Sequence, residues 1–467
     1  MRVNPILSTD SYKFSHFLQY PAGTTRVYSY IESRGGKYPA SVFFGLQAFL
    51  KEYLSKPFTK GDINEAEFIA KAHGEPFNRK GFEYILKVHG GYWPVRIRAP
   101  REGSLIPVSN VLVDIINTDP RCAWVTSFLE TALLRSVWYP TTVATREFYL
   151  RKVIKEYLDK TADNADGIGF KLNDFGSRGA SSTETSALGG MAHLTSFLGT
   201  DNVIALSAAM QYYSANGPVG FSIPAAEHST MTSWGGRDGE EASMRNMLTQ
   251  FAKPGSLVAV VSDSYNLFNA VEKYWAGSLL DQVKSSGATV VIRPDSGDPI
   301  KTPVSVIERL MATLPESEVI INSKGYKMLP SYFRVIQGDG VNEDTIPKIL
   351  EALENRNIST DNIVFGMGAA MLQQLDRDTM KFAMKCSAIE VNSEWRDVFK
   401  DPITDQGKKS KKGLMDLVSI NGVPTTLPRG TGWIDNGIQL LRTVYENGKL
   451  ENEITFDEIR AEVNKNV

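Results

Sequence analysis

Four segments in the middle of the chain run from an apolar, β-prone stretch directly into a short polar loop. The apolar stretches are residues 257–261, 289–292, 333–336 and 363–365. Continuous apolar runs of this length suit strands buried on both faces, as in parallel sheets. Segments of helical length follow two of them, at 304–313 and 343–355. This series of strand, polar loop and helix predicts an α/β barrel or a doubly wound sheet, with chemistry at the carboxyl ends of the strands.

The strand–helix rhythm occupies only the middle of the chain. It begins near Gly167 and fades near Lys385, whereas the flanking segments mix helices, such as 124–138, with strands. Hairpin turns are indicated at Asn421-Gly422 and Asn447-Gly448. A chain of 467 residues is also too long for one small core. We therefore expect two domains: an irregular β/α barrel at 166–385, which is the catalytic domain, and an α+β domain formed by 1–165 together with 386–467.

Bulk composition argues for a cytoplasmic enzyme and against several other classes of protein. The net charge of −2 gives no electrostatic reason to expect nucleic acid or a membrane as partner. No apolar run approaches the roughly 20 residues of a membrane span, and the N-terminus lacks the apolar stretch of a signal peptide. Cys122 and Cys386 are the only cysteines, which makes a disulfide framework or a cysteine-based metal site unexpected.

A run of small residues suggests a phosphate site after the last of the apolar stretches. Residues 366–370 (GMGAA) follow the strand expected at 363–365 and precede a helix expected at 371–375. Small residues there let backbone N–H groups approach a phosphate, and the N-terminus of the helix adds a favourable field. Arg377, further along the same expected helix, and Lys385 are basic residues that could meet the phosphate. The alternatives are an ordinary glycine turn and solvated cations.

Three of the polar loops carry an aspartate directly after the buried strand: Asp263, Asp295 and Asp339. A single Asp in this position is usually a helix cap. At neighbouring strand ends of a barrel, three would converge and could hold ribose hydroxyls, or Mg²⁺ through water. Arg293 would offset part of their negative charge.

His228, in the segment AAEHST, has the most suggestive setting of the five histidines. Near a carboxylate it could act as a nucleophile or as an acid/base. A lone histidine is more often structural, and the remaining four lack a comparable setting: His16, His73, His89 and His193. No clear set of zinc ligands is apparent from the sequence.

A long, ordered set of motifs resembles that of the nicotinamide phosphoribosyltransferase family, within the type II phosphoribosyltransferases. The resemblance runs from the first ten residues to 456–460 (FDEIR). The motifs are 10–13 (DSYK), 28–30 (YSY), 44–47 (FGLQ), 174–179 (DFGSRG), 225–230 (AAEHST), 262–265 (SDSY), 293–297 (RPDSG), 323–327 (SKGYK) and 337–340 (QGDG).

The resemblance implies a reaction, a cofactor and an assembly. Nicotinamide and phosphoribosyl pyrophosphate would give nicotinamide mononucleotide and pyrophosphate in NAD salvage, with Mg²⁺ bound mainly through the substrate phosphates. ATP would be a co-substrate that phosphorylates His228, whose ring Asp263 would hold. The protein would be a homodimer whose two active sites are shared between subunits.

The resemblance also implies how the base is recognised. Phe175 and Tyr12 of the partner subunit would stack on the two faces of the pyridine ring. Asp201 would accept a hydrogen bond from the carboxamide NH₂, and Arg293 would lie near the carboxamide oxygen. A carboxylate in this position would repel the carboxylate of nicotinate, so Asp201 favours the amide over the acid.

The remaining matches concern phosphates and ribose. The positions around the ribose and its 5′-phosphate are Arg178, Asp295, Gly338, Asp339, Gly368 and Arg377. The cations expected to face the pyrophosphate and the ATP phosphates are Arg34 of the partner subunit, Lys385, Lys400 and Lys408.

The chain departs from the family pattern at Ala369 and Ala370, where glycine is expected. Alanine keeps its N–H but disfavours positive φ, which leaves the geometry of the phosphate loop open. Two alternative functions also stay open: a nicotinate phosphoribosyltransferase, and a non-catalytic homologue that binds pyridine nucleotides. Asp201 is the residue that separates the first alternative from the amide-specific enzyme.

Overall fold

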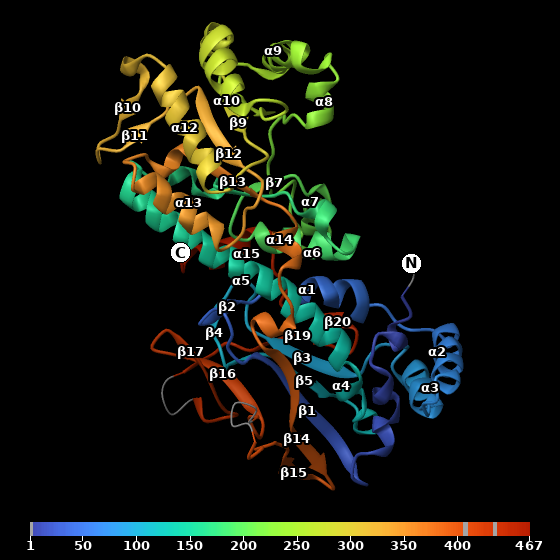
Figure 1. The fold of residues 1–467 in the computed structure, drawn as a ribbon. Coiled ribbons are helices and arrows are strands. Elements are labelled where there is room, and N and C mark those ends of the chain that lie inside the picture. The colour runs from blue at the N-terminus through green and yellow to red at the C-terminus, as the bar shows by residue number, and fades with distance from the viewer. Residues whose placement is uncertain (1–2, 405–409, 433–436) are drawn as a thin grey trace. The chain divides into compact units, whose positions relative to one another are not determined.

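The structure is a computed structural model that describes residues 3–404, 410–432 and 437–467 (Figure 1). The chain forms two compact units. The sheet unit comprises Met1–Thr145, Ala209–Asn216 and Leu375–Asn466, and the barrel unit comprises Arg146–Ala208 and Gly217–Gln374. The units divide at residues 145 and 374, whereas the sequence placed the domain limits at 165 and 385. The first difference arises because the second half of a long helix contributes Leu150, Ile154 and Leu158 to the core of the barrel unit.

A six-stranded sheet in the order β7-β6-β13-β12-β9-β8 organises the barrel unit. Every neighbouring pair in it is parallel. The strands are β6 (Leu172–Asp174), β7 (Gly199–Thr200), β8 (Leu257–Val261), β9 (Thr289–Arg293), β12 (Phe333–Gln337) and β13 (Ile363–Met367). The four strands predicted from apolar runs are therefore confirmed, and a parallel sheet brings all their carboxyl ends to one edge.

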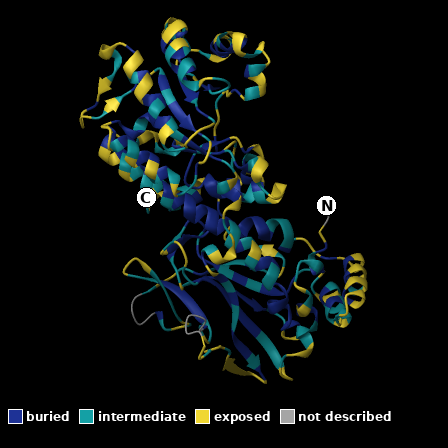
Figure 2. Ribbon diagram, viewed as in Figure 1, coloured by how far each residue is buried: buried dark blue, intermediate teal, exposed yellow. Residues whose placement is uncertain are grey.

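The two faces of this sheet are both buried, which explains the continuous apolar runs (Figure 2). Alternate residues such as Val258, Val260 and Ile292 pack into the large core that includes the surrounding helices. The residues between them form a separate small cluster on the other face, in which Ala259, Val291 and Ile336 are buried. The period of two along each strand thus distributes its side chains between two apolar layers.

A short irregular segment, residues 221–226, connects the two edge strands of the sheet. Phe221 forms a parallel bridge with Gly199 of β7, and Ala225 forms one with Ala259 of β8. The N–H of Ala226 also donates to the carbonyl of Ala259 at 2.9 Å. We call 221–226 the closing segment, because it spans the gap between the sheet edges. The prediction of an irregular β/α barrel is confirmed.

Helices follow the strands of the barrel unit as the sequence predicted, and α12 and α13 confirm the helices expected at 304–313 and 343–355. A small hairpin, β10 (Ile320–Ile321) and β11 (Lys327–Met328), lies between them in the chain. The helices are α6 (Thr183–His193), α7 (Val203–Tyr213), α8 (His228–Thr232), α9 (Glu240–Phe251), α10 (Leu267–Asn269), α11 (Leu280–Ser286), α12 (Lys301–Thr313), α13 (Thr345–Glu354) and α14 (Ala369–Gln373). The residues of α7 from Ala209 onward belong to the sheet unit.

The sheet unit is built around a seven-stranded sheet in the order β15-β14-β1-β5-β3-β19-β20. Its pairs are antiparallel. The strands are β1 (Thr24–Ser33), β3 (Val95–Ala99), β5 (Val111–Asn117), β14 (Phe382–Val391), β15 (Glu394–Asp397), β19 (Arg442–Glu446) and β20 (Lys449–Leu450). Because strands of the C-terminal segment pair on both sides of three strands of the N-terminal segment in one sheet, the predicted α+β fold formed by the two terminal segments is confirmed.

Two smaller sheets complete the strands of this unit, in the orders β17-β16-β18 and β2-β4. Their strands are β2 (Ala40–Val42), β4 (Leu105–Pro107), β16 (Met415–Ile420), β17 (Val423–Pro428) and β18 (Ile438–Gln439). Both predicted hairpin turns are present, joining β16 to β17 and β19 to β20. All four turn residues have positive φ, which is the geometry that Asn-Gly turns favour.

The helices of the sheet unit differ from the prediction at one place. The sequence predicted a single helix over 124–138, but the chain forms α4 (Val125–Phe128) and then α5 (Glu130–Thr161), which is 32 residues long and crosses into the barrel unit. The other helices are α1 (Leu46–Phe49), α2 (Lys60–Ala72), α3 (Arg79–Val88) and α15 (Phe456–Asn464). Within the described ranges, no helix combines the length and the apolar character that crossing a membrane requires.

Candidate active site

The predicted site residues of the barrel unit lie at the carboxyl ends of its parallel strands. Phe175 follows β6, Asp201 follows β7, Asp263 follows β8, Asp295 follows β9 and Asp339 follows β12. Gly368 follows β13 in the same way. The topology of the sheet therefore places residues from six separate loops along one edge.

His228 faces a carboxylate from each of its two ring nitrogens. Its Nε2 lies 2.8 Å from Oδ1 of Asp263, and its Nδ1 lies 3.8 Å from Oδ2 of Asp295. The Asp263 side chain is 5% exposed whereas that of His228 is 45% exposed. A nearly buried carboxylate therefore holds a ring that is accessible to solvent. The structure thus brings His228 together with two of the three aspartates that the sequence predicted at the strand ends.

Local structure accounts for this position of His228. The closing segment is followed by Glu227, which is the N-cap residue of α8, and His228 is the first residue of that helix. Because Ala225 bridges to β8 and Asp263 follows β8, the histidine and its carboxylate partner are anchored to the same strand. The hydroxyl of Ser296 donates to the second carboxylate oxygen of Asp263, which fixes the orientation of that group.

Arg293 ends β9 and is only partly satisfied by its neighbours. Its Nη2 lies 3.5 Å from Oδ2 of Asp295. Its Nε is buried and has no hydrogen-bond partner among the described residues. A buried, unsatisfied guanidinium donor is unfavourable, and a bound ligand with a carbonyl or phosphate oxygen would satisfy it.

The Phe175 ring packs against two glycines, Gly366 in β13 and Gly338 directly after β12. A Cβ added to Gly366 would lie 2.0 Å from Cε2 of Phe175, and one added to Gly338 would lie 3.7 Å from the same atom. The ring also packs against the small apolar cluster inside the barrel, which contains Ile336. Glycine at 366 is therefore required by the close approach of the ring.

Asp201 presents an exposed carboxylate beside this ring-bearing loop. Its Oδ1 accepts a hydrogen bond of 2.6 Å from the hydroxyl of Ser222 in the closing segment. Its backbone N–H donates to the carbonyl of Asp174 at 3.0 Å. Asp174, which precedes Phe175, and Asp201, which follows β7, are thus joined by a backbone hydrogen bond. The second carboxylate oxygen of Asp201 is available to a ligand.

A buried polar layer that was not predicted from the sequence lies beneath these loops. Asp174 is fully buried, and Asn202 Nδ2 donates to its Oδ2 at 2.9 Å. Burial raises the pKa of Asp174, while the charge of His193 and the hydrogen bonds from Asn202 and Gly176 oppose that rise. Asp174 is part of the motif DFGSRG, but the sequence alone does not show that this aspartate is buried.

His193, one of the histidines without a suggestive sequence setting, lies in a buried ion pair. Its Nδ1 is 2.9 Å from Oε2 of Glu147, and both side chains are completely buried. Its Nε2 lies 3.0 Å from the carbonyl oxygen of Gly199 at the start of β7. Burial lowers the pKa of His193, but the hydrogen bond and charge of Glu147, with the charge of Asp174, outweigh burial and raise it.

The predicted ribose and phosphate residues of the barrel unit are arranged around the ends of β6, β12 and β13. Arg178 is exposed in the 3₁₀ turn Ser177–Gly179, and Asp339 is exposed after β12. Gly368 is the N-cap residue of α14, with φ −79°. Ala369 and Ala370 lie within that right-handed helix, so neither needs a positive φ, and Gly179 leaves room for the methyl group of Ala369.

Arg377 does not lie where the sequence predicted. We expected it further along the helix that begins after Gly368, but α14 ends at Gln373. Arg377 instead begins a separate 3₁₀ turn, Arg377–Thr379, which the Asp376 side chain caps, and it belongs to the sheet unit. The short helix stops because the Asp376 cap starts a new turn.

Tyr12 lies in the sheet unit, on the 3₁₀ segment Ser11–Leu18, and its side chain is 51% exposed. The Lys13 ammonium group lies 5.0 Å from the centre of its ring, and the His16 ring meets it edge-on. An aromatic ring this exposed in a polar segment does not contribute to the core of its own unit.

Three predicted phosphate-facing cations form a group in the sheet unit. Burial lowers the pKa of Lys385, and the charges of Arg34 and Lys400 lower it further, against the opposing charge of Glu130. The Arg34 Nη2 is buried without a hydrogen-bond partner among the residues described. This concentration of positive charge suits a polyanion. Lys408 lies outside the described residues.

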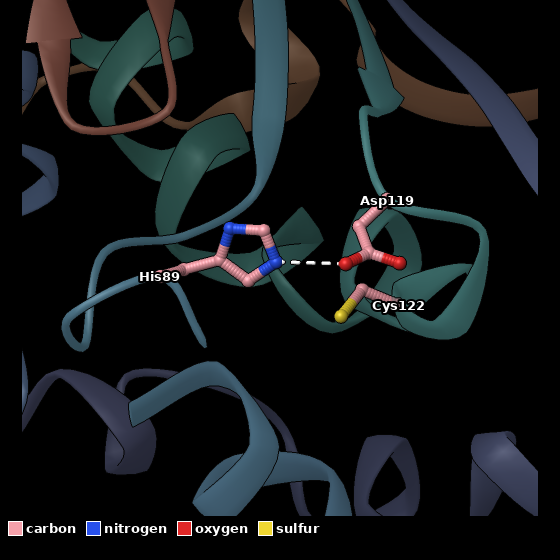
Figure 3. Close-up of side chains that lie close together, drawn as sticks. All are labelled: His89, Asp119 and Cys122. Atoms are coloured by element: carbon pink, nitrogen blue, oxygen red, sulfur yellow. Dashed lines mark hydrogen bonds and ion pairs between the residues drawn. The ribbon is translucent and has the colours of Figure 1, made fainter. Parts of the chain in front are cut away.

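The described residues contain one group with the spacing of metal ligands, formed by His89, Asp119 and Cys122 of the sheet unit (Figure 3). The His89 Nε2 lies 2.8 Å from Asp119 Oδ2, and the Tyr84 hydroxyl donates to that oxygen at 2.8 Å. Burial raises the pKa of the Cys122 thiol to about 12. Because the carboxylate is already satisfied and the thiol stays protonated at neutral pH, we interpret the group as a structural cluster.

Two family models match the chain. The model of the nicotinate phosphoribosyltransferase (NAPRTase) family matches residues 170–449. The model of the nicotinamide phosphoribosyltransferase N-terminal domain matches residues 4–97. Together the matches include parts of both compact units.

Individual relatives agree with these models. The chain is 50% identical to the nicotinamide phosphoribosyltransferase of Xanthomonas campestris pv. campestris, over 98% of this chain and 97% of the relative. It is 33% identical to the nicotinamide phosphoribosyltransferase of Acinetobacter baylyi, with the same coverage of both chains. The structure is similar to the crystal structure of a nicotinate-nucleotide pyrophosphorylase from Pyrococcus furiosus, with a TM-score of 0.61, 14% identity, and 99% and 95% of the two chains covered. This last likeness concerns the fold.

Proposed function

This chain belongs to the nicotinamide phosphoribosyltransferase family of pentosyltransferases, and we propose that it joins nicotinamide to phosphoribosyl pyrophosphate. The products are nicotinamide mononucleotide and pyrophosphate, and the reaction serves NAD salvage. The observation that carries this proposal is the exposed Asp201 carboxylate beside the loop that bears the Phe175 ring. An aromatic platform next to a hydrogen-bond acceptor suits a flat, neutral amide.

Base recognition follows from the properties of three side chains. The Phe175 ring offers one face for stacking on the pyridine ring, supported from behind by Gly366 and Ile336. Asp201 accepts from the carboxamide NH₂ through the oxygen that Ser222 leaves available. The unsatisfied Arg293 Nε donates to the carboxamide oxygen. Nicotinate would place a second negative charge against Asp201, which is unfavourable in a partly desolvated pocket.

The transfer step needs orientation and charge stabilisation more than proton transfer. The pyridine nitrogen attacks C1 of the ribose as the bond to the pyrophosphate oxygen breaks, and positive charge develops on the ribose. Asp295 and Asp339, at the ends of β9 and β12, supply negative charge at this edge of the sheet. Bound Mg²⁺ would neutralise the leaving pyrophosphate, and the exposed Asp339 carboxylate fits a water-mediated contact to it.

ATP coupling is assigned to His228. Asp263 holds the Nε2 side of the ring at 2.8 Å, which leaves Nδ1 as the nitrogen with a free lone pair. This nitrogen attacks the γ-phosphorus of ATP, ADP leaves, and the phosphohistidine is later hydrolysed. The exposure of the ring admits the phosphate. Hydrolysis of ATP would then draw the equilibrium toward the mononucleotide.

The second face of the base and part of the pyrophosphate site are assigned to a second copy of the chain. Tyr12 is exposed and supplies a second aromatic surface. Arg34, Lys385 and Lys400 supply the cations that a departing polyphosphate requires. We therefore propose a homodimer in which Tyr12 and Arg34 of the partner subunit complete each site.

A nicotinate phosphoribosyltransferase is the second candidate, because the model that matches residues 170–449 describes that family. It would share the barrel and the His228–Asp263 pair. The carboxylate of Asp201 is the observation against it, since an acid-specific pocket needs a neutral or cationic partner at that position.

The test is formation of mononucleotide from phosphoribosyl pyrophosphate and Mg²⁺, with nicotinamide or nicotinate supplied separately, each with and without ATP. We expect product from nicotinamide, and more of it with ATP. Product from nicotinate alone would favour the second candidate. An absence of product from both bases would overturn the enzymatic assignment and favour a protein that binds pyridine nucleotides without turning them over.

A further inference from the structure

Asn202 is buried directly behind Asp201 and is the centre of a hydrogen-bond network. It is 1% exposed. Its Nδ2 donates to Asp174 Oδ2 and to the carbonyl of Ser186, both at 2.9 Å. Its Oδ1 accepts from the Ser186 hydroxyl at 3.2 Å, and its N–H donates to the Thr200 hydroxyl at 2.9 Å. Every polar group of the side chain is therefore engaged.

Asp174 extends this network to the loop that bears the aromatic ring. Its Oδ1 accepts a hydrogen bond of 2.7 Å from the N–H of Gly176, the residue after Phe175. One carboxylate thus bridges the Asn202 amide and the backbone of the Phe175 turn. A second connection runs through Ser186, whose hydroxyl lies 2.8 Å from that of Ser177, the residue before Arg178.

The space around Asn202 is matched to its amide group. A Cβ added to Gly190 would lie 2.4 Å from Asn202 Nδ2 and 2.6 Å from the Cβ of Ala205. Hydrogen bonds to a charged acceptor are stronger than neutral ones, and they are strongest where water is excluded. Asp174 is completely buried, so the donors from Asn202 and Gly176 are what keep its carboxylate in this position.

We propose that Asn202 is a positioning residue for base selection: through Asp174 it fixes the spacing between the Phe175 ring and the Asp201 carboxylate. This inference rests on the proposed function, in which those two groups hold the nicotinamide. Asn202 is buried, and no contact with either substrate is assigned to it. Its effect arises because the hydrogen bond of the carboxamide to Asp201 weakens steeply when the distance or angle between the two groups changes.

The variant Asn202→Asp tests the network with almost no change in volume. It removes both Nδ2–H donors and places a second carboxylate against Asp174. We expect the KM for nicotinamide to rise about tenfold and the preference for nicotinamide over nicotinate to fall about tenfold, with kcat at saturating nicotinamide within about twofold of wild type. A merely structural role would lower the amount of folded enzyme without moving the ratio between the two bases.

The exchange Asp174→Asn with Asn202→Asp tests the pairing itself. It restores the bond between the two side chains with donor and acceptor reversed, and the amide oxygen that it introduces at position 174 can still accept from the N–H of Gly176. We expect the double variant to recover the base preference to within about threefold of wild type, since residues in direct contact show coupling. If the double variant loses as much base preference as the product of the losses in the two single variants, the proposal is overturned.

Asn362→Asp is the matched control. Asn362 is also completely buried, and its Nδ2 donates to the carbonyls of Lys327 and Ser359. It precedes β13 and therefore lies at the amino-terminal end of the sheet. We expect this variant to lose stability while keeping the wild-type base preference. A change of preference equal to that of Asn202→Asp would overturn the proposal.

Two further readouts keep the outcomes distinct. If Asn202→Asp does not fold, Ser186→Ala is measured in its place, because it removes the bonds to Asn202 Oδ1 and Ser177. An about threefold loss of base preference would support the inference, and an unchanged preference would overturn it. Wild-type enzyme that makes no product from nicotinamide would refute the proposed function. If the wild type is active and Asn202→Asp keeps the wild-type base preference, only this inference is refuted.

Discussion

His228 derives its chemical character from two carboxylates that approach different nitrogens of one ring. Asp263 is nearly buried and close to Nε2, whereas Asp295 is more exposed and further from Nδ1. The closer partner fixes the ring and its proton, and the more distant one leaves the second nitrogen accessible. This asymmetry is what a nucleophilic histidine requires.

His228→Ala should abolish ATP hydrolysis and the stimulation of transfer by ATP, and leave a slow basal transfer. The physical reason is that the variant loses the only proposed phosphate acceptor, while the base pocket of Phe175 and Asp201 is untouched. Release of ADP and formation of mononucleotide, measured in parallel, check this. ATP stimulation that persists in the variant would exclude His228 from the coupling.

Gly366→Ala should weaken the binding of nicotinamide, because the new methyl group would lie 2.0 Å from Phe175 Cε2 and must displace the ring. We expect the KM for nicotinamide to rise at least about tenfold, with a smaller effect on the KM for phosphoribosyl pyrophosphate. Steady-state kinetics with each substrate varied in turn is the measurement. Gly217→Ala is the control, since nothing lies within 4 Å of the methyl group it would add. Equal kinetics for both variants would contradict the placement of the ring.

The site residues that motifs identify and those that they miss differ in a physical way. Asp263, Asp295 and Asp339 follow apolar runs that are visible in the sequence, and His228 lies in the motif AAEHST. Asn202 and His193 act through burial and through partners far along the chain. No local pattern distinguishes a buried Asn beside an Asp from an exposed one, so their roles emerge only from the packed structure.

Elements of the barrel were predictable where burial dictated their composition. The four apolar runs became strands because both faces of the sheet are covered. The closing segment was not predictable, because it contacts each edge strand through a single bridge and lacks a strand's alternation. The limits of α5 were missed for a different reason: the helix continues through residues that pack in two units, so no change in composition marks the boundary.

The buried pair of His193 and Glu147 anchors two elements, α5 and β7. Glu147 lies on α5, and His193, at the end of α6, approaches the carbonyl of Gly199 that begins β7. The charged groups that face His193 are Glu147 and Asp174, and Arg146 lies 3.7 Å from Glu147. Because β7 leads directly to Asp201, this pair would support the proposed base pocket.

His193→Gln should destabilise the protein in a pH-dependent way. The pKa of His193 is raised on folding above its ordinary value of 6.5. The contribution of the His193–Glu147 pair to the free energy of unfolding is therefore fully present below about pH 6.5. It is lost as the pH rises through the pKa of His193 in the folded protein. We expect a loss of about 3 kcal/mol in the free energy of unfolding at pH 6, and a smaller loss at pH 9.

Thermal unfolding of the wild type and the variant across pH 6–9 measures this effect. The difference in Tm should shrink steadily as the pH increases, because deprotonation removes the charge of His193 in the wild type. A difference that stays constant, or that grows with pH, would contradict a charged His193 in the folded protein.

The sheet unit joins the two ends of the chain, which no local pattern in the sequence specifies. β1 pairs with β14, and this register places Tyr30 opposite Lys385 although they are more than 350 residues apart. The fold class of this unit was predictable from the strands and hairpin turns at each end. The strand order was not, because it depends on long-range pairing between segments with similar composition.

Shared active sites can be tested by mixing two defective copies. Arg34→Ala and Asp295→Ala should each be nearly inactive as homodimers. In a mixed dimer, one site carries both defects and the other carries none, so about half of the wild-type activity should return. Dimers purified through two different affinity tags provide the measurement. Activity no higher than that of the parents, or a fully active monomer in sedimentation, would contradict the shared site.

The most direct test of base selection by Asp201 is a competition between the two bases. Wild-type enzyme and Asp201→Asn are each given equal amounts of nicotinamide and nicotinate with phosphoribosyl pyrophosphate, Mg²⁺ and ATP, and the two mononucleotides are quantified. We predict that the wild type makes almost only nicotinamide mononucleotide, and that Asp201→Asn lowers the amide-to-acid product ratio at least about tenfold, since repulsion of the acid is removed. A ratio unchanged by the substitution, or a wild type that prefers nicotinate, would contradict the assignment.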